Sequence, residues 1–78
     1  MPTVLRAGPY LVYFYSNERD EPPHVHVDRD RETAKFWLDP LKVAGNRGFP
    51  AHELTRIAAI LEDHQFDLLE AWHDFFEE

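Results

Sequence analysis

The stretch HVHVDRDRETAKFWL, residues 24–38, decides the fold because it contains two alternating runs on either side of a charged segment. In His24–Val27 and again in Thr33–Leu38, apolar side chains recur at every second position. That period is typical of a β-strand, in which successive side chains point to opposite faces of the sheet. The charged residues Asp28–Arg31 predict a turn between the two strands. We therefore expect one strand over His24–Val27 and another over Thr33–Leu38.

The segments on either side extend this sheet. Thr3–Ala7 and Tyr10–Ser16 are rich in β-branched and aromatic residues, and the Gly8-Pro9 pair between them predicts a β-hairpin. Tyr10–Ser16 is apolar on both faces, which favours a central strand or a strand covered by a partner. Asn17–Pro23 is polar and ends in two prolines, so it predicts a loop. Leu41–Ala44 predicts a short additional edge strand.

The period changes after a predicted loop at residues 45–48. From Ala51 onward, apolar side chains recur at spacings of three, four and seven, which is typical of an amphipathic helix. The residues of this stripe are Leu54, Ile57, Ala58, Leu61, Leu68, Trp72, Phe75 and Phe76. We predict a single α+β domain, with a small antiparallel sheet of four or five strands in residues 1–48. The sheet packs against one long C-terminal amphipathic helix, or two collinear helices, in residues 49–78.

The charge of the chain is unevenly distributed. Residues 1–48 hold seven acidic and seven basic residues, whereas residues 49–78 hold eight acids and only Arg56, so the C-terminal segment carries the whole net charge of -7. Binding to duplex DNA depends on Lys and Arg that neutralise phosphates, and DNA is therefore a disfavoured partner. The acidic run is either a solvated helix face that keeps the protein soluble or a docking surface for a basic protein.

The composition excludes several classes of protein. A chain of 78 residues without cysteine has neither a disulfide framework nor a thiolate zinc site. Its longest apolar run, Tyr10–Tyr15, is far shorter than the roughly 18 residues of a membrane-spanning helix. Residues 1–4 lack the basic and apolar regions of an export signal. We expect a cytoplasmic protein with no membrane segment.

Several blocks of sequence carry a resemblance to a known family. They are Pro2–Arg6, Gly8–Tyr10, Phe14–Glu18, Glu21–Val27, Ala34–Leu38, Asn46–Phe49 and Glu70–His73. The chain resembles, over nearly its whole length, the small bacterial and archaeal proteins grouped as domain of unknown function 4160 (DUF4160). The most specific block is Pro-Pro-His-x-His-Val. The resemblance implies no defined activity. It implies a small prokaryotic protein encoded beside another small protein, as one half of a toxin–antitoxin-like pair.

His24 and His26 are the most distinctive pair in the sequence. At i and i+2 of a strand, both imidazoles point to one face about 7 Å apart, which is a workable spacing for two ligands of one metal ion. Asp28 continues that face, so His24, His26 and Asp28 form a candidate site for a divalent metal such as zinc, iron or manganese. The alternative is that the histidines are structural and that no cofactor is bound. His52 or His73 could reach the site only if the helix packs on that face.

Proton transfer on RNA is a second chemical hypothesis. His24, His26 and Arg47 are its candidate catalytic residues, since imidazoles transfer protons and a guanidinium stabilises charge on a phosphoryl group. Trp37 could stack on a base. The acids interleaved with the basic residues leave no basic stripe, which makes RNA a weak candidate partner.

Taken with the resemblance, the sequence favours an uncharacterised protein-interaction or regulatory module rather than an enzyme. Ile60 and Phe66 lie off the helical stripe and widen the apolar surface, so a second contact such as a homodimer is one expectation. The other is a complex with the adjacent-encoded small protein. The alternative function is a metal-dependent hydrolase or ribonuclease-type toxin that uses the His-x-His strand.

Overall fold

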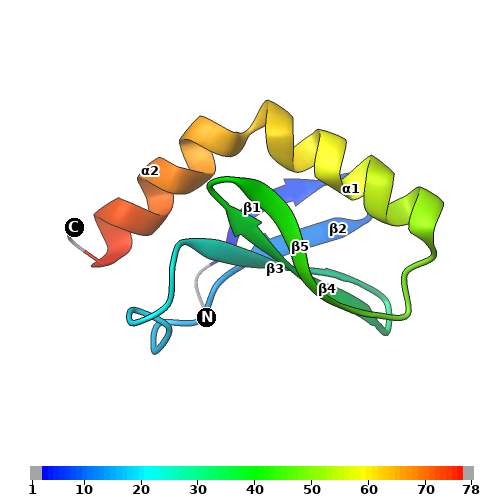
Figure 1. The fold of residues 1–78 in the computed structure, drawn as a ribbon, viewed down its shortest axis with the longest axis horizontal. Coiled ribbons are helices and arrows are strands. Elements are labelled where there is room, and N and C mark those ends of the chain that lie inside the picture. Colours follow the sequence, from blue (N-terminus) through cyan, green and yellow to red (C-terminus); the bar gives the residue numbers. More distant parts are fainter. Residues whose placement is uncertain (1–2, 77–78) are drawn as a thin grey trace.

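The fold is a five-stranded antiparallel sheet with two helices on one face (Figure 1). The computed structural model describes residues 3–76. The strands are β1 (Thr3–Ala7), β2 (Tyr10–Tyr13), β3 (His24–Arg29), β4 (Glu32–Leu38) and β5 (Leu41–Arg47), and the helices are α1 (Ala51–Asp63) and α2 (Gln65–Phe76). The predicted α+β class is confirmed. No helix within residues 3–76 is long and apolar enough to cross a bilayer.

Each strand pairs with its neighbours in sequence, in the order β1-β2-β3-β4-β5. Two-residue turns join three of the four pairs: Gly8-Pro9, Asp30-Arg31 and Asp39-Pro40, the last of which contains a cis peptide bond. Gly8 and Asp30 have φ angles of 57° and 55°, in the left-handed region that tight hairpin turns require. The turn residues thus help to set the register of the sheet.

β3 and β5 are longer than the sequence pattern indicates. β3 continues to Arg29, through part of the predicted turn, and β5 continues to Arg47, through most of the predicted loop at residues 45–48. Both extensions pair with β4, and a register shift in the β4–β5 ladder accommodates the additional residues. Gly48, with a φ of 104°, follows the end of β5. Backbone pairing therefore outweighs the loop-like composition of this segment.

β2 is central, as its apolar character predicts. Tyr10 and Val12 are buried in the core beneath the helices, while Tyr13 is buried on the opposite face. The strand ends at Tyr13 and not at the predicted Ser16, because its pairing with β1 and β3 stops there.

The C-terminal segment forms two helices, so of the two predicted arrangements the structure has the pair of helices rather than one continuous helix. His64 separates α1 from α2 with a φ of -113° and a ψ of 12°, outside the helical range. The Gln65 side chain donates a 2.6 Å hydrogen bond from Nε2 to the carbonyl oxygen of Leu38, which ties the break to the end of β4. The two helices meet at an angle and follow the sheet, which twists as β-sheets do (Figure 1).

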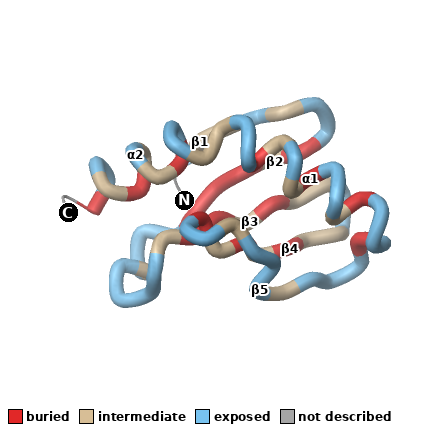
Figure 2. The backbone as a smooth tube through the Cα atoms, turned by 45° about the horizontal axis from the view of Figure 1, so that its top comes forward, coloured by how far each residue is buried: buried red, intermediate tan, exposed pale blue. Residues whose placement is uncertain are grey.

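The main core lies between the sheet and the helices. Strand alternation directs one set of side chains toward the helices, and most stripe residues of α1 and α2 pack inward, whereas Phe75 is 46% exposed. The buried members are Tyr10, Val12, Val25, Val27, Ala34, Phe36, Leu38, Phe49, Ile57, Leu61 and Leu68. Figure 2 shows the buried backbone positions concentrated in the central strands and on one side of each helix.

A second, smaller cluster fixes the end of α2. Phe14, which follows β2, packs on Trp72 and Phe76 with ring centroids 5.2 and 5.6 Å apart. The Trp72 ring also lies 5.0 Å from the ring of His24, the first residue of β3. Both Trp72 and His24 have 0% exposure. This cluster therefore attaches α2 to the start of the histidine-bearing strand.

Leu68 and Phe66, two residues apart on α2, provide a matched test of this packing. Leu68 is buried in the core, whereas Phe66 is 75% exposed. Leu68→Ala is expected to lower the free energy of unfolding by about 2–5 kcal/mol, because it leaves a cavity in a packed core. Phe66→Ala is expected to change it by less than about 0.5 kcal/mol. Urea unfolding followed by circular dichroism measures both, and equal effects would contradict the assigned faces of α2.

Candidate functional site

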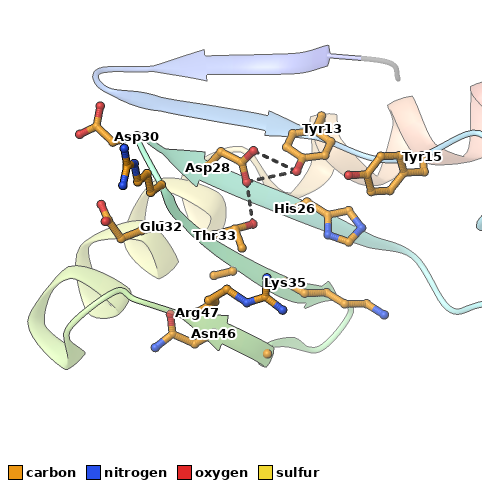
Figure 3. Close-up of a pocket in the computed structure, with 13 residues that line it drawn as sticks. Tyr13, Tyr15, His26, Asp28, Asp30, Glu32, Thr33, Lys35, Asn46 and Arg47 are labelled. Atoms are coloured by element: carbon orange, nitrogen blue, oxygen red, sulfur yellow. Dashed lines mark hydrogen bonds between the residues drawn. The ribbon is translucent and has the colours of Figure 1, made fainter.

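The face of the sheet opposite the helices carries aromatic, histidine and charged side chains. Figure 3 shows these side chains around a shallow concave surface on β2, β3, β4 and β5. The concavity has a volume of about 540 Å³. Residues that line it include Tyr13, Tyr15, His26, Asp28, Thr33, Lys35 and Arg47.

A cluster of Glu18, His24 and His26 lies at one end of this face. Glu18 comes from the loop between β2 and β3, and the two histidines are i and i+2 in β3. His24 Nε2 lies 3.0 Å from Glu18 Oε1, and His26 Nε2 lies 3.0 Å from Glu18 Oε2. The two imidazole rings are 5.2 Å apart. One ligand-type atom from each residue lies within 4.8 Å of the others, which is the arrangement of a candidate metal site.

The two imidazoles differ in their surroundings. His24 is fully buried, and its Nδ1 lies 2.9 Å from the carbonyl oxygen of Pro22. His26 is partly exposed, and its ring stacks on Tyr13 at a centroid distance of 5.4 Å. Tyr15 packs edge-on against the same imidazole at 5.0 Å. Of the two imidazoles, that of His26 is therefore the one that meets solvent beside the concavity.

Glu18 is held in its ionised form. Burial alone would raise its pKa, but the backbone N–H of Tyr15 and the imidazoles of His26 and His24 favour the carboxylate, and the net pKa lies below the ordinary value. The Tyr15 N–H donates a 3.0 Å hydrogen bond to Glu18 Oε1. A negative charge is thus kept between two imidazoles.

Asp28 lies on the same face as His24 and His26, but its carboxylate has other partners. Tyr13 donates its hydroxyl to both carboxylate oxygens at 3.1 and 3.0 Å, and Thr33 donates to Oδ1 at 2.6 Å. Burial raises the pKa of Tyr13 well above its ordinary value, with further contributions from Tyr15 and Asp28, so this hydroxyl remains a neutral donor. The cluster that includes the histidines has Glu18 as its carboxylate, and Asp28 is outside it.

Arg47 and Lys35 extend from neighbouring strands on this face. Arg47 is opposite Thr33 in the β4–β5 ladder, and Lys35 is opposite His26 in the β3–β4 ladder. Both line the same concavity as His26 (Figure 3). The Lys35 ammonium pairs with Glu21 and lies 4.7 Å from the centre of the Trp37 ring. Acids also line the concavity, among them Asp28 and Glu32, so its charge is mixed.

His52 and His73 take no part in this cluster among the residues that the structure describes. Both belong to the helices, which cover the other face of the sheet. The structure thus brings His24 and His26 together and places Arg47 farther along the same face.

A buried carboxylate on α1 is not apparent from the sequence pattern. Glu53 is only 7% exposed, although it lies in the first turn of α1. Arg29 Nη2 donates to Glu53 Oε1 at 2.8 Å, Arg29 Nε donates to Oε2, and the Tyr10 hydroxyl donates to Oε2 at 2.8 Å. The hydrogen bonds from Arg29 hold the pKa of Glu53 below its ordinary value, with a further contribution from Tyr10. This network anchors the start of α1 to β2 and β3.

The outer side of the helical segment forms a second distinctive surface. It carries five exposed acids around one exposed aromatic ring, and no Lys or Arg follows Arg56 in the sequence. We name it the acidic α2 surface, and its residues are Glu62, Asp63, Phe66, Asp67, Glu70 and Asp74. Phe66 and Glu70 are four residues apart on α2 and are therefore neighbours on its surface.

Comparison with known proteins yields one family. The family model described as domain of unknown function (DUF4160) matches residues 10–73, which is most of the chain. No significant match is found among curated proteins or among solved structures. The matched range contains the histidine cluster, the Arg29–Glu53 pair and most of the acidic α2 surface.

The Arg29–Glu53 pair predicts how stability depends on pH. Because the pKa of folded Glu53 lies below the ordinary value of 4.5, the pair stabilises the fold above that pH, and this contribution is lost as the pH falls through the folded pKa. Glu53→Gln is expected to be less stable than the wild type at pH 7, with the difference shrinking toward pH 3. Denaturant unfolding at both pH values measures it. Glu70→Gln, an exposed acid on α2, is the control and should follow the wild type at both.

Proposed function

This chain belongs to the DUF4160 family, and we propose that it is a small cytoplasmic interaction module that docks a basic partner protein on its acidic α2 surface. The observation that carries the proposal is the exposure of Phe66. Its side chain is 75% exposed, and the described residues that define this surface include five acids and no Lys or Arg. A large exposed aromatic ring surrounded by negatively charged side chains is suited to a partner that supplies apolar contact and positive charge.

The two components of this surface contribute differently to binding. Burial of a phenylalanine side chain contributes roughly 1.5–3 kcal/mol of hydrophobic stabilisation. The carboxylates accelerate the encounter with a cationic partner and repel anionic ones, and this effect weakens as salt increases. The partner that fits is therefore an amphipathic segment with Lys or Arg beside an apolar side chain.

The charge also argues against two other occupants of this surface. A second copy of the chain docked through the same surface would place carboxylates against carboxylates, which is unfavourable. Nucleic acid would be repelled by the same charge. A pair of unlike proteins, in which the second chain is basic, is the arrangement supported by this chemistry, and a toxin–antitoxin-like or regulatory pair is one such arrangement.

A synthetic peptide tests the surface directly. The probe is a fluorescent amphipathic peptide of Lys and Leu, about 18 residues long and so roughly five helical turns. Fluorescence anisotropy should show that the wild-type protein binds this peptide and not the same peptide with Glu in place of Lys. Phe66→Ser is expected to weaken binding about tenfold, which is about 1.4 kcal/mol. Glu70→Lys should weaken it as well.

Two matched variants keep this test specific. Val43→Ser removes an exposed apolar side chain on β5, and Asp20→Lys reverses an exposed acid in the β2–β3 loop. Both should bind the Lys peptide as the wild type does. Equal binding of the two peptides, or wild-type binding by Phe66→Ser, would refute docking on the acidic α2 surface.

A further inference from the structure

The buried nitrogen of His24 has no hydrogen-bond partner among the described residues. His24 has 0% exposure, yet its Nε2 makes no hydrogen bond. This atom lies 3.0 Å from Glu18 Oε1, which is a hydrogen-bonding distance without hydrogen-bonding geometry. Buried polar atoms are almost always satisfied, so an unpaired nitrogen aimed into a cluster of ligand-type atoms indicates a missing partner.

The other ring nitrogen determines what this partner must be. His24 Nδ1 lies 2.9 Å from the carbonyl oxygen of Pro22, and since a carbonyl only accepts, Nδ1 carries the hydrogen. In the neutral ring, Nε2 then presents a lone pair toward the carboxylate of Glu18. Two electron-rich atoms at that distance repel each other unless a proton or a metal cation lies between them, and the metal titration below distinguishes the two. A backbone carbonyl bonded to one ring nitrogen is also the usual support of a metal-binding histidine.

The spacing of the three residues suits a single metal ion. Zinc bonds of about 2.0–2.1 Å at tetrahedral angles place ligand atoms about 3.3 Å apart. Here the shortest contacts are 3.0 Å, and all three ligand atoms lie within 4.8 Å of one another. Small side-chain shifts therefore reach coordination distance. Imidazole nitrogens with one carboxylate oxygen are a donor set for zinc and related divalent ions.

We propose that Glu18, His24 and His26 bind one divalent transition metal of the zinc class, with a fourth position open to water or to a group from a partner. This site goes beyond the proposed docking function and lies at the start of β3, where the ring of His24 packs on Trp72 of α2. His24 is the interior ligand, and partly exposed His26 faces the concavity (Figure 3). Metal bound here connects the β2–β3 loop, which carries Glu18, to β3.

Metal titration of the folded, tag-free protein tests the site. Zn²⁺ in competition with a chromophoric chelator at pH 7.5 should bind with one ion per chain at micromolar concentrations. Co²⁺ should give the visible absorption of a tetrahedral complex, and Zn²⁺ should raise the Tm. Glu18→Gln and His26→Gln are each expected to weaken Zn²⁺ binding at least about tenfold.

The controls separate a metal site from a structural histidine cluster. His52→Gln changes an exposed histidine on α1 and should bind Zn²⁺ like the wild type. Phe66→Ser should also retain the site, so that failure of the docking function is distinguishable from failure of the metal site. His24 is buried, and if His24→Gln does not fold, Glu18→Gln and His26→Gln decide the result. Absence of a 1:1 complex, or one that persists in both of these variants, would overturn the proposal and leave an imidazolium–carboxylate cluster.

Discussion

The fully buried contact between the His24 and Trp72 rings fixes the position of α2 relative to the start of β3. It lies where β3 begins and where α2 passes over the sheet, and Phe14 and Phe76 complete the cluster. Because Trp72 faces inward here, helical geometry turns Phe66 and Glu70 outward. Because His24 is fixed by the same contact, its unpaired nitrogen faces Glu18. Both proposed sites thus depend on one aromatic contact.

A second anchor holds α1 through electrostatics. Glu53 accepts hydrogen bonds from Arg29 and Tyr10, so the first turn of the helix is attached to two strands. A buried carboxylate is costly unless it is fully paired, and this one has three donors. The helices are consequently held by a polar network at one end of the segment and by aromatic packing at the other. Among the residues that the structure describes, no Lys or Arg is a member of the acidic α2 surface.

Local patterns in the sequence predict most of the fold and only part of the site. Alternation identifies the strands, and the helical stripe identifies Ile57, Leu61 and Trp72 as packing residues. The sequence allows for two helices but does not place the break at His64, since His64 has no strong helix-breaking character and the break is tied to β4 through Gln65. Alternation also places His24 and His26 on one face. The same alternation predicts Asp28 as the carboxylate beside the two histidines, whereas the structure has Glu18 there. Glu18 lies in the β2–β3 loop, and the path of a loop cannot be read from a periodic pattern.

The strictly sequential order of the strands affects how the protein forms during translation. Every strand pairs only with strands adjacent to it in sequence, which keeps the sequence separation of the paired residues small for a β-sheet and favours faster folding. The helices that cover its apolar face follow the strands in the chain, at residues 51–76. At 5–20 residues per second, the ribosome adds that segment over roughly one to five seconds. During that interval the apolar face of the nascent sheet lacks the helices that cover it in the folded protein.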